Sequence, residues 1–157
     1  PSLIIKEMTS KQSVDGFLDQ TVIAVAGVSR SGRGFGAMAY RALKSAGYKA
    51  LAVNPNGGSI DGEPLHPSFA ALPEPAGAAL VVTPPRESAK AVQDAAAAGI
   101  RRIWLQQGAA SPEAACWCRA NGIDAVSGEC ILMFLAPDKF PHNFHRWIWR
   151  KLGKLPR

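Results

Sequence analysis

Short apolar runs alternate along the chain with segments in which apolar residues recur every three or four positions. The apolar runs span residues 22–28, 49–53, 78–82, 102–105 and 123–126. The first run is continuous over its whole length, which is typical of a parallel strand buried on both faces. The segments of helical period cover residues 34–46, 86–98 and 111–121. This alternation predicts an α/β fold: a doubly wound, mainly five-stranded parallel sheet of the Rossmann-like type, with helices on both faces in three layers.

Local signals mark further elements and their ends. A weaker helical pattern covers residues 9–20, where Ser10 or Ser13 is suited to the N-cap. Residues 67–72 begin with a proline and predict a short helix. Neither a repeat nor a linker interrupts the pattern, and the length suits a single core. We therefore expect one domain over residues 1–138.

The basic charge of the chain is confined to its last residues. The formal net charge is +6, and six basic residues follow Asp138 with no acid among them: Lys139, Arg146, Arg150, Lys151, Lys154 and Arg157. Residues 1–138 therefore carry as many acidic as basic side chains. Because the charge belongs to this tail and not to the domain, it does not indicate a nucleic-acid surface across the fold.

The tail itself, residues 139–157, has an amphipathic pattern that predicts a basic helix. Phe144, Trp147, Ile148 and Leu152 form one apolar stripe. We expect this stripe to pack on the domain, on a second copy of the chain or on a partner enzyme, and not to form a separate domain. The longest apolar stretch falls well short of the roughly 18 residues of a membrane span. A cytoplasmic protein is therefore expected.

The segment after the first strand carries the clearest chemical signal. A glycine turn at Gly27 leads into basic and hydroxyl residues, further glycines and the start of a helix. Such a βα turn can hold a diphosphate, because backbone N–H groups and the helix dipole face the anion. In a parallel sheet, the segments that follow the strands meet at the carboxyl edge, where ligands bind. Residues 54–56, 83–85 and 106–108 would join the glycine turn there.

These four segments contain neither a general acid nor a general base. The sequence therefore predicts a site that binds a ligand, with no catalytic residue to name. A metal site is not indicated either, because Cys116 and Cys118 are separated by one residue, whereas structural zinc sites favour two to four. The odd number of cysteines also excludes a simple disulfide framework.

The glycine loop differs from the dinucleotide fingerprint in two ways. From Gly27 it reads Gly-x-Ser-x-x-Gly, and the second strand ends in Val53-Asn54-Pro55 where a carboxylate would bind the ribose diol of NAD. The nearest acid beyond is Asp61. The missing carboxylate disfavours NAD and fits a 3′-phosphorylated nucleotide, and Arg30 and Arg33 add positive charge beside the expected diphosphate. A P-loop motif is absent from the sequence.

Four short motifs in register extend this interpretation to a family. The sequences GVSRSG, VNP, VTPP and WLQQG follow the four strands in order. Together they resemble the small stand-alone bacterial coenzyme A-binding proteins, which are similar to the CoA-binding Rossmann domain of the succinyl-CoA synthetase alpha subunit. The resemblance covers residues 21–135. It implies a Rossmann fold that binds coenzyme A or an acyl-CoA non-covalently.

By position, the resemblance implies a role for particular residues. The residues at the diphosphate would be Gly27, Val28, Ser29, Arg30, Ser31 and Arg33. The adenosine side would be lined by Val53, Asn54 and Pro55. Across the switch point the ligand would meet Val82, Thr83 and Pro84, and Gln107 would face the pantetheine arm. Two departures are evident: Asn56 and Gly57 replace a lysine of the synthetases, and Glu129 precedes Cys130 where the family tends to have a basic residue.

Two other functions remain open at this level. An NAD(P)-dependent oxidoreductase would share the fold, although it should carry the ribose carboxylate and a proton donor. An interaction module with a vestigial nucleotide site would use the basic aromatic tail to bind a partner. Cys130 lies in an apolar run, which is typical of a buried structural thiol.

Overall fold

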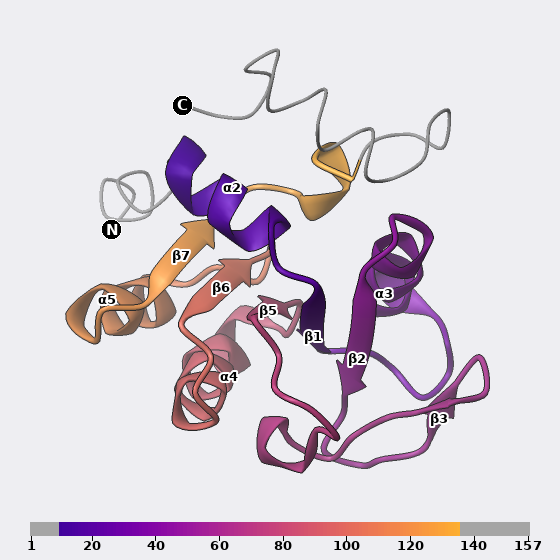
Figure 1. Cartoon of the computed structure of the whole chain (residues 1–157). Coiled ribbons are helices and arrows are strands. Elements are labelled where there is room, and N and C mark those ends of the chain that lie inside the picture. Colours follow the sequence, from indigo (N-terminus) through magenta and orange to yellow (C-terminus); the bar gives the residue numbers. More distant parts are fainter. Residues whose placement is uncertain (1–9, 136–157) are drawn as a thin grey trace.

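A computed structural model describes residues 10–135, so the predicted C-terminal helix lies outside the described residues. Five strands form one parallel sheet: β1 (Val22–Ala26), β2 (Lys49–Val53), β5 (Ala78–Val81), β6 (Arg102–Leu105) and β7 (Asp124–Ser127). Their order is β2-β1-β5-β6-β7, and every neighbouring pair is parallel (Figure 1). The predicted sheet is confirmed.

Helices cover both faces of this sheet and complete the three layers. One face carries α2 (Lys11–Leu18) and α3 (Gly34–Ser45), and the other carries α4 (Pro85–Ala97) and α5 (Pro112–Ala120) (Figure 1). Alternate residues of β1 serve the two faces: Ile23 and Val25 belong to the core under α2 and α3, while Ala24 and Ala26 belong to the core under α4. Double-sided burial explains why the strand reads as a continuous apolar run.

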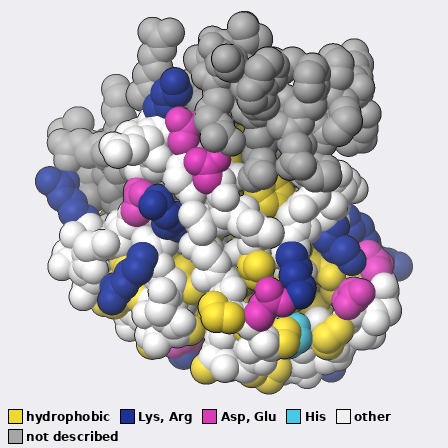
Figure 2. All heavy atoms as spheres, in the orientation of Figure 1, with side chains coloured by type: hydrophobic (Ala, Val, Ile, Leu, Met, Phe, Trp, Pro, Cys, Tyr) yellow, Lys and Arg dark blue, Asp and Glu magenta, His cyan; other side chains and the backbone are white. Residues whose placement is uncertain are grey.

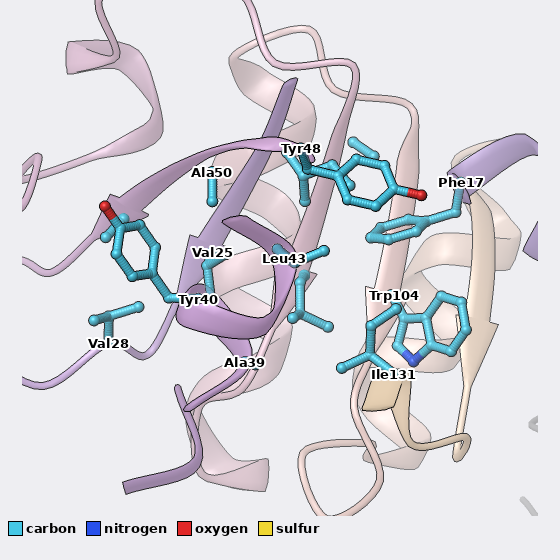
Figure 3. Packing of buried hydrophobic residues seen from close by; sticks show 14 of the residues in the cluster. Phe17, Val25, Val28, Ala39, Tyr40, Leu43, Tyr48, Ala50, Trp104 and Ile131 are labelled. Carbon is cyan, nitrogen blue, oxygen red and sulfur yellow. The ribbon is translucent and has the colours of Figure 1, made fainter. Parts of the chain in front are cut away.

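The core under α2 and α3 is organised around Trp104, which is completely buried (Figure 3). Its ring makes edge contacts with Phe17 and Phe134, with centroid distances of 5.1 and 5.2 Å. The indole Nε1 donates a hydrogen bond of 2.9 Å to the carbonyl of Glu129. A buried tryptophan with a satisfied N–H joins α2 to the segment that follows β7.

The hairpin of β3 (Ser59–Ile60) and β4 (Glu63–Pro64) was not predicted and lies where the sequence indicates only turns. Two short 3-10 turns complete the described chain: η1 (Phe69–Ala71) falls within the short helix predicted over residues 67–72, and η2 (Ile131–Met133) was not predicted. After the hairpin, His66 forms a single parallel bridge with Val53. This bridge stands where the third strand of the 3-2-1-4-5-6 Rossmann order would lie. Strands of two residues are too short to show a period in sequence.

Among the described residues, none of the helices is long and apolar enough to cross a membrane.

Two helical glycines lie in close contacts of different kinds. A Cβ on Gly36, in the first turn of α3, would lie 2.2 Å from the carbonyl oxygen of Gly27. A Cβ on Gly16, in α2, would lie 2.1 Å from Nη1 of Arg102. The first neighbour is backbone and the second is the end of a flexible side chain.

We therefore expect Gly36→Ala to destabilise the fold by about 1–3 kcal/mol, because α3 and the loop at Gly27 must separate. Gly16→Ala should stay within about 1 kcal/mol of the parent, because Arg102 can turn away at the cost of only a partly exposed ion pair with Asp124, and alanine favours the helix. Urea unfolding followed by circular dichroism measures both. Equal free energies of unfolding for the two variants would contradict the close backbone contact.

Candidate nucleotide-binding site

The strands that carry the predicted site end at the same level. In the parallel register Ala26 lies beside both Val53 and Val81, and Val81 lies beside Leu105. The four loops that follow β1, β2, β5 and β6 therefore start together at the carboxyl edge. Between β1 and β5 the chain leaves to opposite faces of the sheet, into α3 and α4. This is the switch point at which open α/β sheets bind ligands.

Gly27 allows the loops after β1 and β5 to approach each other closely. Its φ is +103°, and a Cβ there would lie 2.8 Å from the carbonyl carbon of Val82 and 3.1 Å from the nitrogen of Thr83. Glycine is required for both reasons, because other residues rarely adopt this φ and no side chain fits. Main-chain atoms therefore meet directly at the switch point.

Two serine hydroxyls shape the loop after Gly27. Ser29 Oγ accepts the N–H of Ser31 at 3.1 Å, and Ser31 Oγ accepts the N–H of Arg33 at 3.2 Å. The two hydroxyl oxygens are 2.8 Å apart. One hydroxyl proton forms this bond, which leaves the other available for an acceptor on a ligand. The pair thus orders the loop and still offers a donor.

The same loop carries positive charge. Arg33 is the N-cap of α3 and makes no side-chain capping bond, and the described first turn of that helix contains no acid. The N–H groups at the start of α3 and the positive end of its helix dipole are therefore not neutralised by a capping side chain. Arg30 and Arg33 are both exposed, and neither has an acidic partner within residues 10–135. The arrangement favours an anion.

Asn54 fixes the loop after β2 to the loop after β1. Its Nδ2 donates to the carbonyl of Val28 at 2.8 Å, and its Oδ1 accepts the N–H of Asn56 at 2.8 Å. Both ends of the amide are therefore engaged within the protein, and Asn54 acts by positioning. The side chains of Val28 and Val53 lie in the core, so these two residues present their main chain to the edge. Pro55 is exposed beside them.

Thr83 is part of a series of hydrogen bonds that determines whether its hydroxyl can donate to a ligand or only accept from one. Ser88 Oγ is completely buried and donates its single proton to the carbonyl of Ala109 at 2.6 Å. Thr83 Oγ1 lies 2.9 Å from Ser88 Oγ, so the threonine proton completes this second bond. The free lone pairs of Thr83 can then only accept a hydrogen bond from a ligand. Through Ser88, these hydrogen bonds connect Thr83 in the loop after β5 to Ala109 in the loop after β6. Pro84, the next residue, is the N-cap of α4.

Gln107 is exposed, and its N–H donates to the carbonyl of Glu129 at 3.2 Å. Within the described part of the chain, no hydrogen bond joins Gln107 to the other three loops. Its neighbour Gln106 is buried, and its Oε1 accepts the N–H of Ile131 at 2.9 Å. The sequence offers no way to assign these different roles to two adjacent glutamines.

Asp61, the nearest acid after β2, is committed to another partner. Its carboxylate forms a bidentate ion pair with Arg41 of α3, at 2.7 and 2.8 Å. Arg41 also donates to the carbonyl of Gly32 at 2.9 Å, so the hairpin is attached to the glycine loop through this side chain. The hydrogen bond from Arg41 lowers the pKa of Asp61 and raises the pKa of Arg41. Sequence reasoning noted Asp61 only as the nearest acid beyond the second strand and missed its ion pair with Arg41.

The three cysteines lie in different environments, and of these Cys130 follows a strand at this edge, after β7. Burial raises the pKa of the Cys118 thiol to about 12, so this residue is a structural part of α5. Cys116 is exposed, and Cys130 is half-buried at the start of η2.

A parallel sheet with a glycine-rich loop at its switch point defines a Rossmann-type α/β domain. The family described as CoA binding domain matches residues 21–136, and the chain belongs to this family. No curated protein is significantly similar to it in sequence.

Solved structures show the same fold. A conserved hypothetical protein from Pyrococcus furiosus is 31% identical, with a TM-score of 0.66 over 71% of this chain and 96% of that one. A Thermus thermophilus protein is 27% identical, with a TM-score of 0.70 over 80% and 96%. A hypothetical protein from Pyrococcus horikoshii is 21% identical, with a TM-score of 0.72 over 79% and 88%.

The stabilisation from the ion pair between Asp61 and Arg41 should depend on pH in one direction. The pKa of Asp61 is lowered from its ordinary value of 3.8, so the ion pair stabilises the fold above that value. The stabilisation should be lost as pH falls through the lowered pKa. We expect the melting temperatures of the parent and Asp61→Asn to differ above the ordinary pKa of 3.8 and to converge as the pH falls below it and the carboxylate is protonated. A difference that stays constant as the pH falls would contradict the ion pair.

Proposed function

We propose that this domain binds coenzyme A or an acyl-CoA non-covalently at the carboxyl edge of its sheet. The observation that carries the proposal is the contact of Gly27 with Val82 and Thr83, which makes a main-chain surface at the switch point of a CoA-binding domain. The ligand is a small molecule with a diphosphate, and the anion-favouring loop next to Gly27 suits that group.

Each loop has a part in this proposal. The loop after β1 holds the diphosphate through main-chain N–H groups and the spare serine proton. The loop after β2, fixed by Asn54, lines the adenosine side. Thr83 accepts a hydrogen bond from an N–H or O–H of the ligand, and Gln107 reaches the pantetheine arm.

The proposed function is binding, because the segments that carry the site, residues 27–33, 54–58, 82–84 and 106–110, contain no carboxylate, histidine or cysteine. Chemistry on the acyl group, if it follows, would be supplied by a partner enzyme. A competing NAD-dependent oxidoreductase would need a ribose carboxylate after β2, and Asp61 is held instead by Arg41.

Calorimetric titration with CoA, acetyl-CoA, NAD, NADP and ATP tests the proposal. We expect saturable binding of CoA and acetyl-CoA and much weaker binding of the other three. Tight binding of NAD without binding of CoA would overturn it.

A matched pair of variants tests where the ligand binds. Thr83→Val removes the hydroxyl that accepts from the ligand and should weaken CoA binding by about 2- to 10-fold, the range of one neutral hydrogen bond. Thr21→Val makes the same change at an exposed residue before β1, at the opposite edge of the sheet, and should leave the affinity unchanged. Equal effects of the two substitutions would exclude the carboxyl edge.

A further inference from the structure

Arg30 reaches from the loop after β1 to the loop after β2. A Cβ on Gly58 would lie 2.9 Å from Cδ and 3.1 Å from Cγ of Arg30. The aliphatic stem of the arginine therefore occupies the space that a side chain at position 58 would need. The φ of Gly58 is +102°, so both its backbone conformation and this contact favour glycine. The stem lies against the backbone while the guanidinium stays at the surface.

The guanidinium has no competing partner there. Residues 54–58 read Asn-Pro-Asn-Gly-Gly and carry no charge of their own. In the part of the chain that the structure describes, Arg30 forms no ion pair, and Asp61 is bound to Arg41. The bond between Asn54 and Val28 holds the two loops together, and the stem of Arg30 crosses at their junction.

This junction is where the ribose of a nucleotide lies in a Rossmann-type site. The end of the second strand meets the ribose hydroxyls, and in NADP sites an arginine nearby accommodates the phosphate on the 2′ position, next to the 3′ position that carries the phosphate in CoA. The planar guanidinium can bind a phosphate through two parallel hydrogen bonds. Arg33 is different in position, because it stands at the start of α3 beside the expected diphosphate.

We propose that Arg30 binds the phosphomonoester on the ribose of the ligand and makes the site selective for a 3′-phosphorylated nucleotide. This inference rests on the proposed binding of CoA and names the residue that distinguishes CoA from its dephosphorylated form. In this arrangement Arg30, from the loop after β1, supplies the positive charge that residues 54–58 lack. Gly58 has no side chain and so leaves room for the aliphatic stem of Arg30.

The test compares CoA with dephospho-CoA, which differs only in the 3′-phosphate. In the parent protein, CoA should bind at least about tenfold more tightly, as expected for a charged hydrogen-bonded contact. Arg30→Gln should weaken CoA by that factor, change dephospho-CoA by less than about twofold and so bring the ratio of the two affinities close to one. In the matched control Arg33→Gln, both ligands should change by the same factor, which leaves the ratio at its parent value.

A second pair of variants tests the contact of the Arg30 stem with Gly58 and leaves every charged residue unchanged. Gly57→Ala and Gly58→Ala both place a side chain at a positive φ, of +66° and +102°, and both should lower the melting temperature. A Cβ on Gly57 has as its nearest atom the carbonyl oxygen of Leu65, at 4.0 Å. Therefore Gly58→Ala alone should reduce the affinity ratio of CoA to dephospho-CoA.

The outcomes separate this inference from the proposed function. If Arg30→Gln weakens both ligands equally, Arg30 contacts the diphosphate and the inference is wrong, while CoA binding stands. If the parent binds CoA and dephospho-CoA equally, the ribose phosphate is not recognised and the inference is also wrong. Binding of neither ligand overturns the proposed function and the inference with it. Arg30-dependent binding of NADP without CoA would assign the phosphate to the 2′ position and overturn both.

Discussion

The contact of three backbone segments at Gly27 is the constraint on which the site depends. Its Cα faces the main chain of Val82 and Thr83, and its carbonyl lies against the first turn of α3 at Gly36. Because neither contact leaves room for a Cβ, the ends of β1 and β5 and the start of α3 have fixed relative positions. The loop between Gly27 and α3 must then fold over a short span, and the hydroxyls of Ser29 and Ser31 order it.

Polar side chains at this edge divide into those that hold the loops and those left for a ligand. Asn54, Ser88 and Gln106 are engaged by hydrogen bonds within the protein, and each joins two loops or a loop and a helix. The groups that remain are one serine proton, the lone pairs of Thr83, main-chain amides and two arginines. This set is suited to an anionic ligand with hydrogen-bond donors, and it contains no group that would transfer a proton at neutral pH.

The sequence predicted the sheet well because buried parallel strands and amphipathic helices have strong periods. The ends of the elements agree within a few residues, and Ser10 is the N-cap of α2. The hairpin of β3 and β4 was missed because two-residue strands carry no period, and its attachment depends on an ion pair between residues far apart in sequence. The motifs placed the four loops correctly at one edge, since parallel topology alone brings them together.

The division of roles within the site could not be predicted in the same way. Asn54 and Thr83 are both small polar residues after a strand, yet Asn54 uses both its amide nitrogen and its amide oxygen to hold the protein's own main chain, whereas Thr83 retains acceptor capacity only. The difference follows from the hydroxyl protons: Ser88 donates to the carbonyl of Ala109, so Thr83 must donate to Ser88 and has no proton left for a ligand. Likewise, the path of Arg30 across Gly58 depends on a contact between two loops, which no local pattern encodes.

The reliance on bare main chain at Gly27 has a consequence for how such a domain can diverge. Amide groups are common to almost every amino acid, so most substitutions around the switch point leave the anion donors intact, provided that the glycines persist. Sequence drift can then alter which nucleotide is preferred, through single side chains at the loop tips, without dismantling the ability to hold a diphosphate. Recognition of the common part of the ligand is thereby robust, while discrimination between ligands remains easy to change.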